Sequence, residues 1–334
     1  MRFELGQKII DKIRKPFIRV KWREVVKERE IDMKFKLKEF IDVYNNLLDD
    51  DYSKQTYLNV LQYRLNSKFG IKSALQTPSK EIQGSIINDD GNKFEVFNGI
   101  SNFKISELNL SSLGIDLRYY GDPSGIYYVM DQYSYINNGV CIDINDGDTV
   151  IDGGGCYGDT ALWFSHKVGE KGKIYSFEFL DKHLDIFTKS LGLNPHLKNR
   201  IKIFKKALHS DSKSDLYVYE NGSGTFCSME KIAWGGGSPY MIKTKSIDDL
   251  VKEEGLEKVD FIKMDIEGSE LVALKGAKRT ICQYKPNLAI CIYHKIEDFY
   301  MIPKYIKQIV PEYKLYVKHH TDMDWETVLY ASVR

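Results

Sequence analysis

The sequence has little excess charge of either sign, because 48 Lys and Arg side chains are balanced by 47 Asp and Glu side chains to a formal net charge of +1. This balance gives no support for a nucleic-acid partner, which a strongly basic protein would suggest. Cysteine is also scarce, with five residues and no C-x-x-C pair. An odd number without that spacing argues against a disulfide framework and a structural zinc site, and it fits a reducing cytoplasm.

Long apolar runs are missing as well. No 18 consecutive apolar residues occur, and the first twenty residues lack the continuous apolar core of a signal peptide, so we expect neither a membrane span nor a signal peptide. Residues 1–30 contain ten Lys and Arg against five Asp and Glu, with apolar side chains at helical spacing. An amphipathic surface that binds a membrane or a partner is therefore an alternative to an ordinary solvated helix face.

The sequence divides into two regions at about residue 125. Residues 1–125 predict a mainly helical region with a small β element, including a helix that starts at the N-cap candidate Ser53 and a strand-like run at 93–99. Residues 126–334 alternate β-branched runs with helical patterns, which is typical of an α/β fold with a mostly parallel sheet.

The second region predicts seven strands, the last two forming an antiparallel hairpin because their connection is short. The strands are expected at 148–152, 173–179, 201–205, 259–265, 287–293, 313–318 and 327–332. The helices are expected near 158–168, 181–192, 246–254, 269–283 and 297–309.

A glycine-rich turn follows the first of these strands, in the segment DTVIDGGGCYGDT (148–160). Gly153, Gly155 and Gly158 match the G-x-G-x-x-G pattern of a dinucleotide site, whereas Asp152 followed by glycines matches the turn that holds S-adenosylmethionine. Glycines serve either cofactor, because the missing Cβ lets the backbone approach the ligand. The glycines alone do not decide between the two.

Asp152 separates the two interpretations. A dinucleotide places its pyrophosphate at the N-terminus of the following helix, where a nearby carboxylate costs on the order of 1 kcal/mol or more. S-adenosylmethionine brings an ammonium and a sulfonium, which a carboxylate favours. The alternative is that Asp152 only caps the turn. Glu178, at the end of the second strand, can accept hydrogen bonds from the ribose hydroxyls of either cofactor, so it does not distinguish between the two cofactors.

A second motif, VDFIKMDIEGSELVALKGA (259–277), is an apolar strand that ends in Asp265 and Glu267 before an amphipathic helix. Both carboxylates are expected at the ligand-binding edge of the sheet. Methyl transfer to a hydroxyl needs a group that takes the proton or a metal that acidifies it, whereas dinucleotide enzymes have no standing need for this acid pair. The alternative is that the two acids only cap the helix that starts near Ser269.

His294 follows the fifth strand and is the leading candidate for a general base, because an unperturbed imidazole titrates near neutrality. A hydrogen-bonded structural histidine is the alternative. A metal site formed by Asp265, Glu267 and a histidine is also conceivable, but the spacing is not diagnostic, so no metal is assigned.

Five motifs in order resemble the FkbM family of S-adenosylmethionine-dependent methyltransferases, over roughly 125–334. They are VIDGGGCYGDT, YSFEF, KTKSIDDL, FIKMDIEGSELVALKGA and the closing segment from YHKIEDFYMIPKYI to WETVLYA. The resemblance implies the class I methyltransferase fold, a Rossmann-like sheet of six parallel strands and one antiparallel strand. It also implies an O-methyltransferase that acts on a hydroxyl of a glycan, sugar nucleotide or secondary metabolite.

The resemblance also implies roles for matching residues. The implied cofactor-binding residues are Asp152, Gly154, Gly155, Gly158, Thr160, Glu178, Phe179 and Asp265. Asp265 and Glu267 are expected to orient cofactor and acceptor, with His294 as the base. The family usually has Ala, Asn and Pro where this chain has Gly155, Cys156 and Phe179, which alters loop stiffness and adenine packing.

Two other functions stay open. A nicotinamide-dependent oxidoreductase or epimerase would explain the glycines but not Asp152 or the acid pair. A non-catalytic binding module on a methyltransferase scaffold has no physical reason to keep Asp152, Glu178 and Asp265 together. We expect a cytoplasmic enzyme with a small-molecule or glycan acceptor, and no pattern indicates an oligomeric state.

Overall fold

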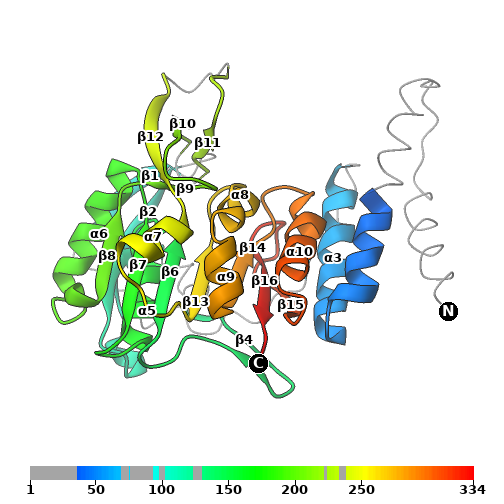
Figure 1. Cartoon of the computed structure of the whole chain (residues 1–334). Coiled ribbons are helices and arrows are strands. Elements are labelled where there is room, and N and C mark those ends of the chain that lie inside the picture. Colours follow the sequence, from blue (N-terminus) through cyan, green and yellow to red (C-terminus); the bar gives the residue numbers. More distant parts are fainter. Residues whose placement is uncertain are drawn as a thin grey trace.

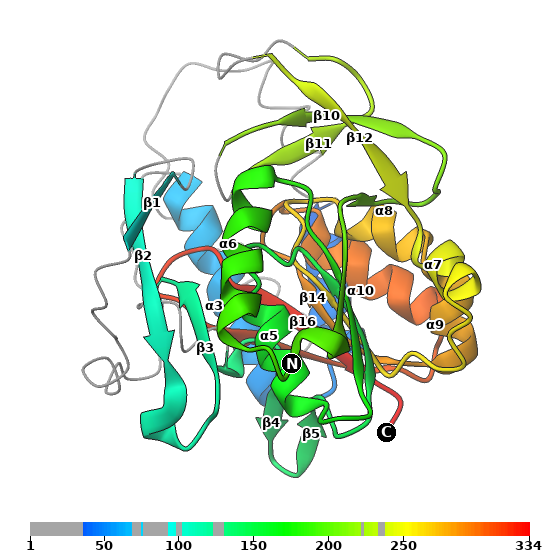
Figure 2. The ribbon, with the colours of Figure 1, turned by 90° about the vertical axis from the view of Figure 1, so that its left-hand side faces the viewer.

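The computed structural model describes residues 36–68, 75, 93–97, 102–122, 130–221, 224–232 and 238–334. The amphipathic surface predicted in residues 1–30 lies outside the described residues. At the centre of the described chain is a seven-stranded sheet with helices on both faces (Figure 1 and Figure 2).

The strands of the central sheet begin and end within two residues of the predicted positions. They are β6 (Thr149–Gly153), β7 (Lys173–Phe177), β8 (Ile201–Phe204), β13 (Phe261–Met264), β14 (Asn287–Cys291), β15 (Lys314–His319) and β16 (Thr327–Ser332). Their order in space is β15-β16-β14-β13-β6-β7-β8. Neighbours from β8 to β14 pair in parallel, and β16 is antiparallel to both β14 and β15, which confirms the predicted closing hairpin.

The chain leaves β6 toward β7 and β8 on one side, and returns to β13 and β14 on the other. The strand order therefore reverses between β6 and β13. Open α/β sheets bind ligands beyond the carboxyl ends of the strands at such a reversal point. This places the ends of β6 and β13, where both sequence motifs lie, at the expected ligand site.

Two layers of helices cover the sheet (Figure 2). One layer contains α5 (Asp159–Lys167) and α6 (Asp181–Leu193), and the other contains α7 (Ile247–Glu253), α8 (Glu270–Lys275), α9 (Lys278–Tyr284) and α10 (Asp298–Ile309). The single helix predicted at 269–283 is two helices. Gly276 is the C-cap of α8, and it packs so closely that a Cβ at this position would lie 2.1 Å from the carbonyl oxygen of His209.

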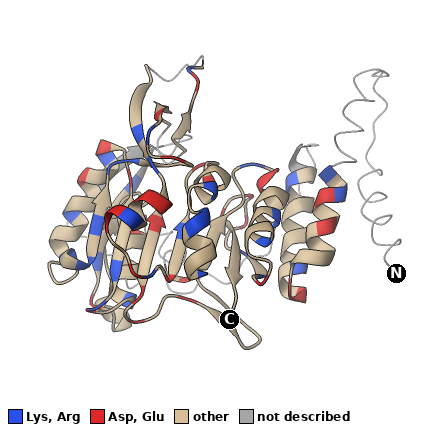
Figure 3. Ribbon diagram, in the orientation of Figure 1, with Lys and Arg blue, Asp and Glu red and all other residues tan. Residues whose placement is uncertain are grey.

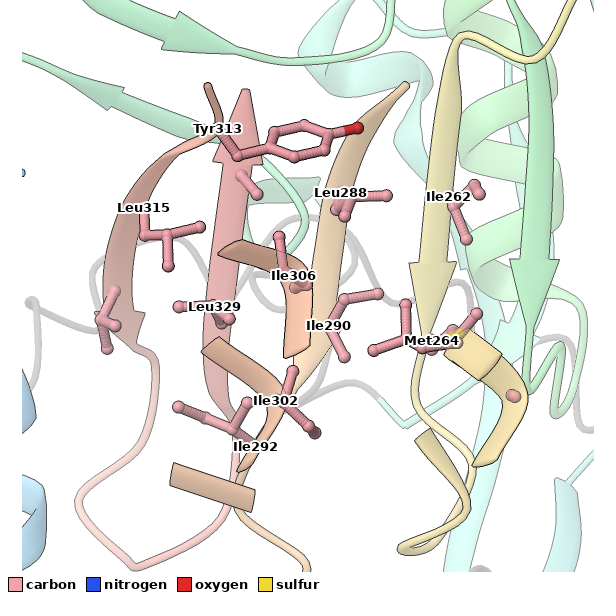
Figure 4. Close-up of a cluster of buried hydrophobic side chains, with 14 of the residues drawn as sticks. Ile262, Met264, Leu288, Ile290, Ile292, Ile302, Ile306, Tyr313, Leu315 and Leu329 are labelled. Carbon is pink, nitrogen blue, oxygen red and sulfur yellow. The ribbon is translucent and has the colours of Figure 1, made fainter. Parts of the chain in front are cut away.

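Side chains of each strand alternate between two buried clusters, as the period of two in a β-strand requires. Ile290 of β14 and Leu329 of β16 pack under Ile302 and Ile306 of α10 (Figure 4). Cys291, one residue along, joins the cluster on the α5 side. Burying one large aliphatic side chain stabilises the fold by about 1.5–3 kcal/mol. The two clusters therefore stabilise the strands whose ends position the site.

Residues 36–68 lie at the β15 edge of the sheet, beside α10 (Figure 1). Helical residues 36–42 continue into a π-helical turn, η1 (Val43–Leu47), and α3 (Asp51–Lys68) packs against β15. Arg64 of α3 donates hydrogen bonds to the carbonyl oxygens of Tyr293, at 2.5 Å, and Asp324, at 3.0 Å.

The predicted N-cap of this helix was wrong. The carboxylate of Asp50, not the hydroxyl of Ser53, caps α3 by accepting a hydrogen bond of 2.7 Å from the backbone N–H of Ser53. The Ser53 hydroxyl instead accepts a hydrogen bond of 2.9 Å from the N–H of Val317 in β15. Ser53 therefore fastens the helix to the sheet.

Smaller β elements surround the central sheet. β1 (Lys93–Phe97), β2 (Asn102–Asn109) and β3 (Arg118–Gly121) form an antiparallel sheet that agrees with the strand-like run at 93–99, with a 3-10 turn η2 (Leu110–Leu113) between the last two. β4 (Tyr135–Asn137) and β5 (Val140–Ile142) form a hairpin, and a short η3 (Lys198–Arg200) precedes β8.

A four-stranded sheet that was not predicted stands over the carboxyl ends of the central strands (Figure 1). It consists of β9 (Ala207–Leu208), β10 (Asp215–Tyr219), β11 (Phe226–Ser228) and β12 (Tyr240–Lys245). This sheet forms one wall of the cavity described below.

The outer helices carry both signs of charge, interspersed in the view of Figure 3, in keeping with the charge balance of the sequence. None of the described helices has both the length and the apolar character that crossing a bilayer requires.

Candidate active site

A cavity of about 580 Å³ opens at the carboxyl ends of β6, β7 and β13. Six predicted site residues line it, namely Gly154, Thr160, Glu178, Phe179, Asp265 and Glu267. The other four, Asp152, Gly155, Gly158 and His294, are not among its lining residues and lie behind the wall. The structure therefore brings the predicted residues together, with six of them at the cavity surface and four behind it.

The glycine turn is shaped by close packing. Gly154 has a φ of +84°, and a Cβ there would lie 1.9 Å from the carbonyl oxygen of Asp265. Gly158 has a φ of +88°, and a Cβ there would lie 2.1 Å from the ring of Phe187. Only glycine fits these positions, because L-residues with a Cβ rarely adopt this conformation and the space is already filled.

Asp152 points into the turn rather than into the cavity. Its side chain is fully buried and accepts a hydrogen bond of 2.7 Å from the Ser176 hydroxyl. The Thr160 hydroxyl donates to it at 3.2 Å, and Nζ of Lys263 lies 3.2 Å from its Oδ1. The sequence predicted direct attraction between Asp152 and a cationic cofactor, whereas its geometry holds the turn together and its charge is matched by Lys263.

Lys263 is the partner that the sequence analysis missed. It is 1% exposed, and its Nζ also donates a hydrogen bond of 2.6 Å to the carbonyl oxygen of Gly154. Burial alone would lower the pKa of Lys263, but the charges of Asp152 and Asp265 outweigh burial and raise it. The available signal was a single charged residue inside the apolar strand FIKM.

Glu178 is held at the start of α6. Its Oε1 accepts hydrogen bonds from the backbone N–H groups of Phe179, at 2.6 Å, and Leu180, at 2.8 Å. Its Oε2 lies 3.2 Å from Nδ1 of His183. Oε1 accepts two backbone hydrogen bonds whereas Oε2 has one described partner, His183, so Oε2 is the oxygen that can also accept a hydrogen bond from a ligand hydroxyl.

Asp265 is held by two tyrosines that the sequence analysis did not single out. The hydroxyls of Tyr133 and Tyr293 donate to its two oxygens at 3.0 Å and 2.9 Å. Burial opposes ionisation of Asp265, but the positive charges of His294 and Lys263 and the two tyrosine hydrogen bonds outweigh burial and lower its pKa. Asp265 is therefore an ionised, fixed acceptor at the cavity wall.

Glu267 reaches the cavity from a strained backbone. Its φ is +54°, a conformation that costs a residue with a Cβ about 1–3 kcal/mol and is concentrated at functional sites. Burial raises the pKa of Glu267 to about 7, with the positive charge of His294 opposing this effect. Glu267 thus presents a carboxyl group that titrates near neutrality.

His294 lies among three carboxyl groups. Its Nε2 is 3.4 Å from an oxygen of Asp265 and 3.4 Å from an oxygen of Glu267, and its Nδ1 is 3.0 Å from Oε1 of Glu270. Burial alone would lower the pKa of His294, but Glu270 above all, with Asp265 and Glu267, raises it to about 10. An imidazole that is already protonated at neutral pH does not accept a proton, which differs from the expected base with an ordinary pKa.

Glu326 is a further group that the sequence analysis missed. It lines the cavity, has a φ of +63° and accepts a hydrogen bond from Nε2 of Gln132. Burial and the charge of Asp265 raise its pKa to about 8. Glu326 lies at the end of a polar loop, directly before β16. Its spacing from the other acids follows no sequence motif.

The cavity as a whole is acidic. Six acids line it against two lysines: Asp122, Asp159, Glu178, Asp265, Glu267 and Glu326 against Lys206 and Lys263. The charge of Lys263 is already matched by Asp152. Such a cavity favours cationic ligands and disfavours phosphates.

An α/β sheet in this strand order, with a glycine turn and acidic strand ends at the reversal point, defines a class I methyltransferase fold. The family model of the Methyltransferase FkbM domain matches residues 144–316, more than half of the chain, and the chain belongs to this family. The family membership that the motifs indicated is thereby confirmed, and a nicotinamide-dependent oxidoreductase is not favoured.

Two individual proteins are similar to this chain. Methyltransferase sdnD of Sordaria araneosa is 26% identical over 175 residues, which cover 43% of this chain and 67% of that protein. The crystal structure of Methyltransferase FkbM from Methylobacillus flagellatus KT is 22% identical, with a TM-score of 0.57 over 90% of this chain, and supports the fold. This chain spans 60% of the length of that structure.

Proposed function

We propose that the protein transfers a methyl group from S-adenosylmethionine to a hydroxyl oxygen of a glycan or secondary metabolite. The observation that carries this proposal is the acidic cavity at the glycine turn, in a chain of the FkbM family. Like charges a few ångströms apart repel by on the order of 1 kcal/mol or more per pair, depending on local dielectric. The lining acids that are ionised at neutral pH therefore disfavour the pyrophosphate of a nicotinamide cofactor and the diphosphate of a sugar nucleotide, and favour the cationic methyl donor.

Six of the eight predicted cofactor residues have a role that their contacts support. Glu178 offers Oε2 to the ribose hydroxyls, and Phe179 beside it provides an apolar edge for the adenine. The Gly154 backbone approaches the ligand closely, and Asp152 with Thr160 keeps the turn in place. Asp265 faces the methionine end of the cofactor.

Methyl transfer from a sulfonium is an in-line displacement, so positioning of the acceptor oxygen provides much of the rate. The electron pair of the C–S bond goes to sulfur as the oxygen forms its bond to carbon. The hydroxyl proton must leave as well. Asp265 and Glu267 lie where they can orient the acceptor and handle this proton, with His294 behind them.

The acceptor side of the cavity contains Trp325, whose side chain is 41% exposed. An exposed tryptophan in a cavity that is also lined by carboxyl groups and the amide of Gln132 suits a sugar ring, which stacks its C–H face on aromatics and hydrogen-bonds through its hydroxyls. This supports a carbohydrate acceptor over a purely apolar one.

Calorimetric titration of S-adenosylmethionine, S-adenosylhomocysteine and NADH in parallel tests the cofactor. We expect micromolar binding of the two adenosyl ligands and none of NADH. Glu178→Ala is expected to weaken binding about tenfold or more, because it removes the ribose acceptor and frees the start of α6. The control Glu312→Ala, at an exposed carboxyl that pairs with Lys285 outside the cavity lining, is expected to bind like the parent. Binding of NADH alone would sink the proposal.

The affinity for S-adenosylmethionine is expected to rise with pH between 5 and 7. Burial raises the pKa of the cavity-lining Asp159 to about 6, with Asp152 also raising it and Lys263 opposing. A bound cation favours the ionised form, so binding releases a proton below this pKa and costs affinity there, about tenfold at pH 5 relative to pH 7.5. Titrations across this range check the slope. Asp159→Asn is expected to reduce the slope, with the remainder due to Glu267, whose pKa is about 7, and an unchanged slope in this variant would contradict the assignment.

A further inference from the structure

His294 is buried without a hydrogen-bond partner. Its side chain is 7% exposed, and neither ring nitrogen makes a correctly oriented hydrogen bond to any described residue. Most buried polar groups in proteins are hydrogen-bonded, so an imidazole that meets three carboxyl groups without an aligned hydrogen bond needs an explanation. Its Nε2 is directed between Asp265 and Glu267, both of which line the cavity.

The distances around Nε2 suit a shared cation better than hydrogen bonds. Nε2 lies 3.4 Å from Oδ1 of Asp265 and 3.4 Å from Oε2 of Glu267, which is long for a charge-assisted hydrogen bond. Adjacent ligand atoms at about 2.0–2.2 Å from a metal ion are separated by roughly 3 Å or slightly more. Asp265 and His294 belong to a set of ligand-type atoms that lie within 4.8 Å of one another, whereas Glu267 would join the same ion by a rotation of its side chain.

Glu270 completes a recurrent arrangement of metal sites. It is fully buried, accepts a hydrogen bond of 2.8 Å from the N–H of Ile266, and holds Oε1 3.0 Å from Nδ1 of His294. Ligand-type atoms of Asp265, Glu270 and His294 lie within 4.8 Å of one another. In metal sites a carboxylate beside the distal histidine nitrogen fixes the ring and its tautomer.

The ammonium groups of Lys263 and Lys295 point away from the position between His294, Asp265 and Glu267. Lys263 directs Nζ toward Asp152 and the carbonyl oxygen of Gly154. Lys295 directs Nζ toward the carbonyl oxygen of Gly268. Three carboxyl groups thus meet one imidazole, a surplus of negative charge that suits a divalent ion.

We propose that His294, Asp265 and Glu267 bind one divalent first-row cation, such as Mn²⁺ or Zn²⁺, at the cavity wall, with Glu270 as the positioning residue for His294. Mixed imidazole and carboxylate ligands suit this class of ion. Three protein ligands leave coordination positions that face the cavity, where an acceptor hydroxyl can bind.

The role of the ion rests on the proposed function, although its binding does not. A hydroxyl bound to the ion ionises more easily and gives its proton to solvent. The resulting alkoxide attacks the methyl carbon, the C–S electron pair goes to sulfur, and S-adenosylhomocysteine leaves. The ion thereby supplies the deprotonation, and His294 binds the ion through Nε2 as a neutral imidazole.

The test is calorimetric titration of Mn²⁺ and, separately, Zn²⁺ into the whole chain after removal of metals with EDTA and desalting, without cofactor. We expect one ion per chain. His294→Gln is expected to weaken binding at least about 100-fold, and Glu270→Gln about 10- to 100-fold. The control His209→Gln, which removes an imidazole paired with Asp211 outside the cavity lining, is expected to leave metal binding unchanged.

Binding of S-adenosylmethionine to the same variants keeps the two proposals apart. The metal site is supported if His294→Gln loses metal binding but still binds S-adenosylmethionine. If His294→Gln does not fold, Glu267→Gln, at a partly exposed ligand, takes its place with the same expected loss. Binding of neither ion by the parent chain, or equal binding by parent and variant, overturns the metal site whatever the cofactor result. Metal binding in a chain that binds no S-adenosylmethionine would instead count against the proposed function alone.

Discussion

Replacing Lys263 by methionine is expected to lower the free energy of unfolding by about 3–5 kcal/mol, because it leaves buried carboxylates without their cation. Lys263 is 1% exposed, its Nζ lies 3.2 Å from Asp152, and its charge also acts on Asp265. Methionine fills similar volume, so the loss reports the charge rather than a cavity. Domains of ordinary stability have only about 5–15 kcal/mol to lose. Equilibrium urea denaturation at pH 8, followed by circular dichroism, measures the change.

A surface lysine in an ion pair provides the matched control. Lys258 is about half exposed and lies 2.8 Å from Asp260, so Lys258→Met is expected to change stability by no more than about 1 kcal/mol. Adding Asp152→Asn to Lys263→Met removes one uncompensated charge and is expected to restore part of the loss. A loss below about 1 kcal/mol for Lys263→Met would show that the carboxylates do not depend on this cation.

Substitution of Gly154 by alanine is expected to abolish cofactor binding. The new Cβ would lie 1.9 Å from the carbonyl oxygen of Asp265, at a φ of +84°, so the turn must move away from β13. Strain and displacement together cost on the order of 3 kcal/mol or more, which corresponds to over 100-fold in affinity if the loss falls on binding. Titration of S-adenosylmethionine and urea denaturation of the same variant divide the loss between binding and folding.

Gly192 in α6 is the matched control, because a Cβ there meets nothing within 4 Å. Gly192→Ala is expected to leave binding unchanged and to stabilise the protein by roughly 0.5–1 kcal/mol, since alanine has the higher helix propensity. Parent-like binding and stability in Gly154→Ala would refute the packing described for the turn.

The central sheet was predictable because its signal is local. Each strand is a short apolar run between turn residues, and the helices between them show a period near 3.6. The sheet of β10, β11 and β12 gave no such signal, since its strands are only half buried and lie between polar and glycine-rich segments. The N-cap error has a similar cause, as Asp50 and Ser53 are both good capping residues and only the structure shows which one faces the helix.

Most residues of the candidate site could be predicted from the sequence, but the contacts between them could not. The spacing of Asp265 and Glu267 places both at a strand end, but the positive φ of Glu267 that turns it toward His294 has no sequence signature in a residue other than glycine. The pKa of His294 depends on Glu270, which looked like an ordinary residue of the first turn of α8. Lys263 stood out in its apolar strand, yet its partner Asp152 is 111 positions away.

The contact between α3 and β15 has a consequence for how the protein matures. The hydrogen bond from Val317 to Ser53 joins residues 264 positions apart, and Arg64 holds the carbonyl oxygens of Tyr293 and Asp324 beside the site. Contacts this distant along the chain form late in folding. A ribosome that has not yet released residues 314–319 therefore carries a chain whose helix α3 has no strand to dock on. We expect methyl transfer to begin only after residues 314–319 have left the ribosome and paired with α3.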